Sequence, residues 1–232
     1  MRLAGHQRWR DLLFLHWPAS RDALRPLVPD TLEIDSFAGQ AYVSLIPFAI
    51  AESRAAGAPG LLATHFLETN LRTYVRAADG EPGIYFFSLE ASSLLAVAAA
   101  RLLFGLPYFP AAMAMRREGA EIEYASRRRG ARDAMIEVAW SIGDAMEGAA
   151  AGTRDHFLIE RYSLYVTRVG RLYRSRVRHP PYPLRRVAVR RLVQTVVMAA
   201  GLSESTTPPL CHYSPGVDVD IFWLERVAAL PG

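Results

Sequence analysis

The sequence contains no lysine, because all 27 of its basic residues are arginine. Asn70 is its only asparagine. A GC-rich genome explains both features, since GC-rich codons favour Ala, Arg, Gly and Pro. The chemical consequence does not depend on that cause. A lysine amine is the usual group that forms an imine with a ketone during covalent carbonyl catalysis. Here only the α-amine of Met1 is available for such an imine.

Cysteine and long apolar runs are also scarce. Cys211 is the single cysteine, which excludes an internal disulfide and a zinc site built from cysteines. The apolar stretch Leu94–Phe104 contains Arg101 and is too short for a membrane span, which needs about 20 residues. Leu12–Leu15 is too short for the core of a signal peptide. The sequence therefore predicts a soluble, cytoplasmic protein without membrane contact.

The pattern of the remaining residues predicts a mainly β protein. The chain has 232 residues, of which 51% are hydrophobic and 22% charged, and no linker divides it. Strands are expected at Arg8–Trp17, Thr31–Phe37, Gln40–Phe48, His65–Arg76, Gly83–Glu90, Met113–Arg117, Glu121–Arg128, Ala134–Ile142, Leu164–Thr167, Arg171–His179 and Val217–Trp223. Many short strands without a strand–helix rhythm predict an antiparallel barrel or sandwich.

A few helices are expected around these strands. They are a short helix capped by Ser20 that ends near Val28, a helix from Ser92 or Ser93 to Phe104, and the segments Thr153–Tyr162 and Leu192–Ala200. Gly105 should end the second helix. This helix is apolar nearly all round, so we expect it to be buried or clamped between layers.

The strand His65–Arg76 contains the strongest candidate site. Side chains alternate across a strand, so Glu68, Asn70 and Arg72 share one face. Neighbours on that face lie about 6.6 Å apart, which would let the three side chains surround one small ligand. The alternative is that the polar face contacts water and the apolar face contacts the core. The pattern alone favours this alternative.

The segment Arg161–Arg191 is strongly basic, with ten arginines and no acidic residue. Tyrosines lie between the arginines, and such a pattern can hold nucleic acid. The net charge is only +4, and no nucleic-acid-binding signature is present. We therefore interpret the segment as a solvated strand face and predict no specific nucleic-acid binding.

No motif for a metal or a bound cofactor appears. The six histidines are scattered without HExxH or paired spacing. Cys211 and His212 are adjacent, and adjacent strand residues point to opposite faces. We therefore expect an inert, buried cysteine, no metal and no cofactor. The sequence leaves open a metal site assembled from distant residues.

Several motifs resemble a known superfamily. The stretch "DALRPLVPDTLEID" (22–35) closely resembles the N-terminal motif of acetoacetate decarboxylase. The whole chain is more similar to the YqjF-like uncharacterised proteins of the acetoacetate decarboxylase-like superfamily. The motifs that carry this similarity are "ETNLRTYVR", "GIYFFSLEASS", "LFGLPYF", "GRLYRSRVRHPP" and "HYSPGVDV". The resemblance spans about 8–227. It implies one domain over 1–232, an antiparallel β-barrel or cone with a few packed helices and an internal ligand cavity.

The resemblance also implies site residues. The first-strand arginine of the decarboxylase corresponds to Arg10, and one cavity glutamate corresponds to Glu68. A second cavity glutamate falls near Ser44 and is therefore absent. The Pro-Lys-Lys segment that supplies the imine lysine corresponds to residues 107–109, where Tyr108 takes the place of a lysine. The loop would thus keep its position and lose its nucleophile.

These correspondences favour an inward-facing polar face on the strand His65–Arg76. They predict a barrel that binds a small, partly apolar carboxylate or carbonyl compound without Schiff-base decarboxylation. Arg10 or Arg72 would hold the anion, and Tyr108 and Asn70 would form hydrogen bonds. A homo-oligomer is compatible with the sequence.

The alternative function is a non-imine enzyme, such as an isomerase, hydratase or lyase. Glu68 would then be the general base and Tyr108 the general acid. A buried, desolvated Glu68 would favour the enzyme, and a cavity lined only by apolar groups and arginine would favour binding alone. We expect Glu68, close to an arginine, to stay ionised.

Overall fold

The computed structural model describes residues 1–130, 134–203 and 207–227, which fold mainly as strands. The strands are β1 (Leu3–Ala19), β2 (Leu32–Ile34), β3 (Ala41–Ala55), β4 (Thr64–Ala77), β5 (Pro82–Ala91), β6 (Tyr108–Glu118), β7 (Glu121–Arg128), β8 (Met135–Met146), β9 (Ser163–Arg168), β10 (Arg171–Arg178), β11 (Leu184–Gln194), β12 (Leu210–Phe222) and β13 (Glu225–Arg226). The helices are α1 (Arg21–Leu24), α2 (Leu94–Ala99), α3 (Arg154–Ile159) and α4 (Val196–Ala199). Short 3₁₀ turns cover Arg25–Leu27 and Gly60–Leu62, and a π-helical turn, η3 (Ala100–Phe104), continues α2. Within the described ranges, no helix is long and apolar enough to cross a membrane.

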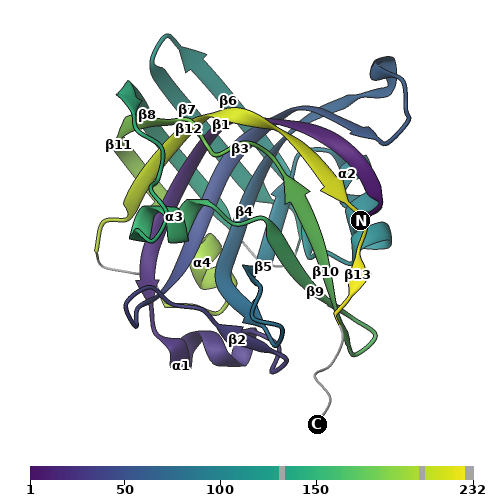
Figure 1. The fold of residues 1–232 in the computed structure, drawn as a ribbon. Coiled ribbons are helices and arrows are strands. Elements are labelled where there is room, and N and C mark those ends of the chain that lie inside the picture. Colours follow the sequence, from purple (N-terminus) through teal and green to yellow (C-terminus); the bar gives the residue numbers. More distant parts are fainter. Residues whose placement is uncertain (131–133, 204–206, 228–232) are drawn as a thin grey trace.

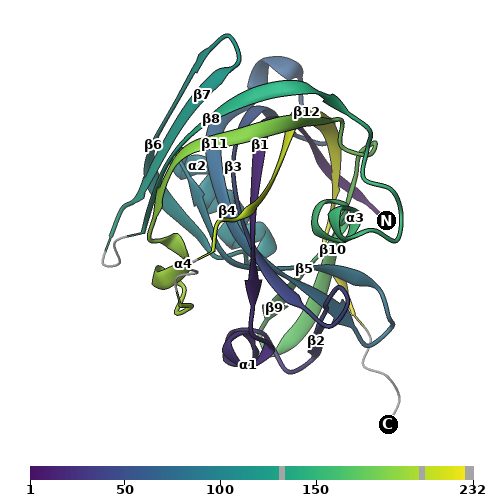
Figure 2. The same cartoon turned by 90° about the vertical axis from the view of Figure 1, so that its left-hand side faces the viewer.

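The strands join into one large curved sheet, which confirms the predicted fold class (Figures 1 and 2). Its order is β13-β10-β9-β5-β6-β7-β8-β11-β12-β1-β3-β4-β2, with further pairings of β4 with β5 and of β10 with β12. These pairings close two circuits that share the wall β12-β1-β3-β4-β5. One circuit is completed by β6, β7, β8 and β11, and the other by β9 and β10. The sheet is not wholly antiparallel, because β5 runs parallel to β6 and to β9.

The middle of the shared wall, at β4, is buried on both faces. On β4, Leu71 and Val75 belong to the apolar core on the side of β7 and β8. Phe66 and Tyr74 belong to a second core on the opposite side. The polar set that includes Glu68 alternates with Leu71 and therefore faces the second core. From Glu68 to Val75, both faces of β4 are buried, so the alternative in which its polar face is solvated is wrong.

For the segment from Ser93 to Gly105, the predicted ends are confirmed and the predicted burial is wrong. The Ser93 side chain accepts a hydrogen bond from the Ala96 amide, and Gly105 ends the π-helical turn with φ +67°. The expectation that this segment is buried is wrong, since Leu94 is 64% exposed and Leu102 76% exposed. Only one side of the segment is covered, because Val97 packs into the second core while the opposite side faces water.

The predicted helix Leu192–Ala200 is wrong over its first half. Residues up to Gln194 continue β11, and Gln194 pairs with Ile136 of β8. Helix α4 begins only at Val196. The apolar residues here fit both the helical period of 3.6 residues and the strand period of 2 residues. Pairing with the long strand β8 favours the extended conformation.

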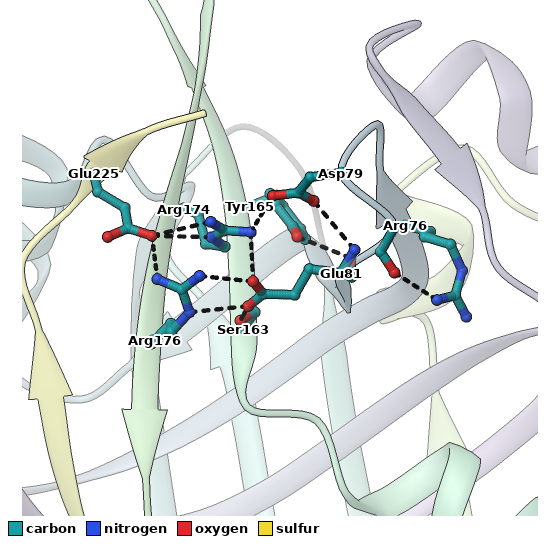
Figure 3. A network of polar contacts seen from close by, with 9 residues as sticks. Arg76, Asp79, Glu81, Ser163, Tyr165, Arg174, Arg176 and Glu225 are labelled. Carbon is teal, nitrogen blue, oxygen red and sulfur yellow. Dashed lines mark hydrogen bonds and ion pairs between the residues drawn. The ribbon is translucent and has the colours of Figure 1, made fainter. Parts of the chain in front are cut away.

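Charged side chains attach the β9–β10 hairpin to its neighbours (Figure 3). Backbone pairing is sparse there, with two residue pairs between β5 and β9 and two between β10 and β12. Arg174 contacts Asp79 at 2.8 Å, and Arg176 contacts Glu81 at 2.6 Å. Glu225 accepts from both arginines. Part of the basic segment is thus neutralised within the fold, while the absence of specific nucleic-acid binding stays a prediction.

Candidate functional site

The second core contains a partly open cavity of about 230 Å³. Its walls come from β1, β3, β4 and β5 on one side and from β9 and β10 on the other, and Ala96, Ala99 and Leu103 of the α2–η3 segment also line it. Most of the lining is apolar or aromatic, including Phe14, Phe48, Phe66, Phe86 and Leu89. Four polar residues predicted from the sequence also line it: Glu68, Asn70, Arg72 and Tyr108. The structure therefore brings together four of the five candidate residues.

Glu68 and Tyr108 form a buried pair at one end of this cavity. Glu68 is 3% exposed and Tyr108 9% exposed. The Tyr108 hydroxyl donates a hydrogen bond to Glu68 Oε2 over 2.8 Å. Tyr108 begins β6 beside Leu89 of β5, and Leu89 lies opposite Asn70 of β4. Two long-range strand pairings therefore place the tyrosine at the glutamate.

Burial changes the proton affinity of this pair. The pKa of Glu68 is raised to about 7, because desolvation and, to a smaller extent, the nearby Glu90 raise it more than the hydrogen bonds from Tyr108 and Asn70 lower it. Burial and the nearby Glu68 hold the pKa of Tyr108 well above its ordinary value. The expectation that Glu68 stays ionised is therefore wrong, because no arginine compensates its desolvation. At neutral pH, Glu68 can both hold and release a proton.

Arg72 is a buried cation without a counter-ion. It is 7% exposed, and none of the described acidic residues forms an ion pair with it. Nη2 donates to the Leu158 carbonyl oxygen over 3.1 Å, and Nε has no partner among the described residues. The guanidinium also lies 5.7 Å from the Tyr74 ring centroid. A guanidinium has five N–H donors, so most of those of Arg72 are not used by the fold.

Arg161, a second arginine in the cavity wall, differs from Arg72 because it has an acidic partner. Its Nη1 atom lies 3.0 Å from Asp35 Oδ2, and its Nε donates to the Phe157 carbonyl oxygen over 2.8 Å. Arg161 thus has an acidic partner, which it shares with Arg76 at 3.3 Å. The sequence pattern places Arg161 only in the basic segment and does not signal its position in the cavity wall. Asp35 lies 126 residues away, so no local pattern signals their contact.

Arg10 does not line the cavity, so its predicted place in the site is wrong. Its Nη2 atom contacts Asp218 over 2.6 Å on the outside of the sheet. Asp11 has φ +53°, and the pairing of β1 with β3 shifts register after Arg10. This irregularity reverses the alternation, so that Trp9 lies on the cavity side before it and Leu12 after it.

Phe109 points away from Tyr108, toward a second buried ion pair. The Arg128 guanidinium lies 4.0 Å from the Phe109 ring centroid and is hydrogen-bonded to Glu90. Glu90 is 0% exposed. The lysine pair of the resemblance is thus replaced by a tyrosine in the cavity and a phenylalanine outside it. No sequence pattern signals Glu90 or Arg128, because each looks like an ordinary strand residue.

The described residues contain no group of three or more His, Cys, Asp and Glu side chains placed to hold a metal ion. Cys211 and His212 do not form a reactive dyad. The Cys211 thiol contacts the Pro209 carbonyl oxygen, and burial raises its pKa to about 11. His212 instead contacts Asp155 at 3.4 Å.

The curved sheet with its cavity is the fold of the acetoacetate decarboxylase-like proteins. The structure of the enduracididine biosynthesis enzyme MppR complexed with pyruvate matches with a TM-score of 0.71 and 12% identity, covering 98% of this chain and 92% of that chain. Acetoacetate decarboxylase from Legionella pneumophila matches with a TM-score of 0.63 and 13% identity, covering 97% and 88%. At this level of identity the matches establish the fold alone.

The sequence comparisons define the family. The chain belongs to the DUF2071 family, described as "Uncharacterized conserved protein", whose profile matches residues 6–218. It is 42% identical over 221 residues to the uncharacterized protein YqjF of Bacillus subtilis, a match that covers 95% of this chain and 90% of the relative. The resemblance noted in the sequence is confirmed.

Proposed function

We propose that this protein binds a small organic carboxylate in the cavity between β4 and the β9–β10 hairpin. The observation that carries this proposal is the buried guanidinium of Arg72, which has no acidic partner in the described chain. An unpaired buried charge costs several kcal/mol, and a bound carboxylate would offset that cost with charge-assisted hydrogen bonds. The aromatic lining would hold the apolar part of the ligand.

Neighbouring charges support an anion rather than a cation. Arg161 is paired with Asp35, and Glu68 has a pKa of about 7 and is therefore partly protonated at neutral pH. Among the charged residues that line the cavity, Arg72 thus carries a positive charge that no described acidic residue pairs with. A single carboxylate matches this charge, and the pyruvate with which MppR is complexed belongs to the same chemical class.

Titration calorimetry with octanoate tests the proposal. Wild-type protein is expected to bind, and Arg72→Met should weaken binding about tenfold to a hundredfold, as for a lost hydrogen bond to a charged group. Arg10→Gln is the matched control, since Arg10 pairs with Asp218 outside the cavity, and it should leave the affinity unchanged. Equal affinity in Arg72→Met and wild type would contradict the proposal.

A second function is favoured by the proton affinity of Glu68. A carboxyl group with a pKa near 7, 2.8 Å from a tyrosine hydroxyl inside a cavity, is suited to general acid–base catalysis. Glu68 would remove a proton next to a carbonyl, and the Tyr108 hydroxyl would stabilise the developing oxyanion. No imine takes part, because the chain contains no lysine.

Proton exchange distinguishes catalysis from binding alone. An oxo acid is incubated with the protein in D₂O, and loss of its α-proton signals is followed by NMR. A catalyst should accelerate exchange, and Glu68→Gln should remove about 10²- to 10⁴-fold of that acceleration. If the oxo acid binds but its α-protons exchange at the uncatalysed rate, the acid–base function is wrong and only the binding function stands.

A further inference from the structure

The two polar ends of the cavity lie far apart along β4. Glu68 and Arg72 are four residues apart, and β4 pairs with β3 without a register shift between Val43 and Ile50. On a regular strand this separation places their Cα atoms about 13 Å apart. Both side chains project into the same cavity, so a ligand that contacts both must span much of this distance.

The contacts of Arg72 turn its guanidinium away from Glu68. Nη2 of Arg72 and the Tyr74 hydroxyl both donate to the Leu158 carbonyl oxygen, over 3.1 and 2.8 Å. Tyr74 is the next residue on this face beyond Arg72. The Glu68 carboxyl instead contacts Tyr108 at the other end. Burial and, to a smaller extent, the charge of Arg72 lower the pKa values of His16 and His179. Burial and, to a smaller extent, the charge of Glu90 raise the pKa of Glu68. These effects agree with the separation of the two ends.

The stretch of cavity wall beside Asn70 is apolar on both flanking strands. Ile46 of β3 and Leu89 of β5 lie opposite Asn70 in the two flanking ladders, and both line the cavity. An apolar ligand segment would therefore pack against Ile46 and Leu89. The Asn70 Oδ1 atom has no partner among the described residues.

We infer that the ligand is an elongated monocarboxylate whose carboxylate meets Arg72 and whose distal carbonyl or hydroxyl oxygen meets Glu68 and Tyr108. This inference rests on the proposed carboxylate site. The Cα separation of about 13 Å is a lower bound for the distance between the two polar side-chain ends, because the Arg72 guanidinium turns away from Glu68. Hydrogen bonds of about 3 Å at each end then leave at least about 7 Å for the ligand. An extended chain covers about 1.2 Å per bond, so at least about six bonds separate the two polar groups. In pyruvate and acetoacetate the two groups are too close to reach both ends.

Two isomers of one oxo acid provide the test. 2-Oxooctanoate and 7-oxooctanoate have the same atoms and the same chain, and only the position of the ketone differs. Calorimetry is run at pH 6, where Glu68 is mostly protonated. 7-Oxooctanoate should bind about threefold to tenfold more tightly than 2-oxooctanoate, as for one additional hydrogen bond. The double variant Glu68→Leu/Tyr108→Phe should bind the two isomers equally.

The outcomes separate this inference from the proposed function. If wild-type protein binds 2-oxooctanoate as tightly as 7-oxooctanoate, or tighter, the elongated ligand is wrong and the carboxylate site stands. If neither isomer binds, or if Arg72→Met binds both as wild type does, the proposed function fails and this inference fails with it. The isomer comparison on wild-type protein is independent of the folding of any variant.

Discussion

The Tyr108 hydroxyl lies 2.8 Å from Glu68 Oε2, although forty residues separate the two in the sequence. The contact joins the start of β6 to the middle of β4 through β5. It places a proton donor beside a carboxyl group whose pKa is about 7. The chemistry of the cavity therefore depends on the proton shared between these residues and on the charge of Arg72 at the opposite end.

Glu68→Gln should change the pH dependence of stability. The pKa of Glu68 rises from 4.5 in the unfolded chain to about 7 in the fold, so the folded protein holds a proton that the unfolded chain releases between these values. Wild-type stability should fall as the pH rises through this range and then level off. The variant lacks this loss. The unfolding free energy of the variant minus that of wild type should therefore rise by about 3 kcal/mol from pH 4 to pH 8, as measured by urea unfolding. An identical pH profile for both proteins would contradict the raised pKa.

Tyr108→Phe should raise the pKa of Glu68 further. The Tyr108 hydroxyl stabilises the ionised carboxylate, so its removal favours the protonated form. Carbon NMR of labelled glutamate carboxyls measures the titration. Tyr213→Phe is the matched control, because that hydroxyl contacts Asp11 and does not line the cavity. A Glu68 titration that moves equally in both variants, or only in the control, would refute the assigned contact.

Two arginines in one cavity should respond oppositely to the same substitution. Arg72→Met removes an unpaired buried charge and should stabilise the ligand-free protein by about 1 kcal/mol or more. Arg161→Met leaves the buried Asp35 carboxylate only its 3.3 Å contact with the partly exposed Arg76 and should destabilise the protein by about 1–3 kcal/mol. Urea unfolding of both variants measures the difference. Strong destabilisation by Arg72→Met would mean that Arg72 serves the fold rather than a ligand.

The β9–β10 hairpin should loosen when its charges are removed. Glu81→Gln weakens the contact with Arg176, and hydrogen exchange of the β9 and β10 amides should accelerate. The arginines lower the pKa values of Asp79 and Glu81, so their stabilisation is present above pH values near 4 and is lost as the pH falls through the lowered values. Partial exposure keeps the effect small and salt-dependent. Glu121→Gln, which frees Arg190 elsewhere, should leave these amides unchanged. Equal acceleration in both variants would refute a local role.

Incubation with acetoacetate and borohydride should leave no adduct on any side chain. The chain has no lysine to form the imine, and Tyr108 cannot replace that amine. Intact mass and peptide mapping measure the result. A trapped adduct on any residue other than Met1 would show covalent chemistry that this structure does not explain.

The sequence predicted the local features of the fold and the site. Alternation along β4 placed Glu68, Asn70 and Arg72 on one face, and Ser93 and Gly105 marked the ends of the α2–η3 segment. These features depend on neighbouring residues, so a local pattern is enough to find them. The resemblance added Tyr108, which no local pattern connects to β4.

The errors arise where distant residues decide the outcome. Arg10 faces outward because of the irregular backbone at Asp11 and the acid Asp218, which lies 208 residues away. Arg72 does not stabilise the ionised form of Glu68, because Leu158 and Tyr74 hold the Arg72 guanidinium at the other end of the cavity. Both outcomes depend on side-chain direction in three dimensions, which strand alternation alone does not determine.

A crystal structure of the protein in complex with 7-oxooctanoate tests most directly the central claim, that the cavity binds a carboxylate at Arg72. We predict electron density for the acid in the cavity between β4 and the β9–β10 hairpin, with its carboxylate within hydrogen-bond distance of the Arg72 guanidinium. A cavity that contains only water at saturating ligand, or a carboxylate bound elsewhere while Arg72 keeps only its contact with Leu158, would contradict the account.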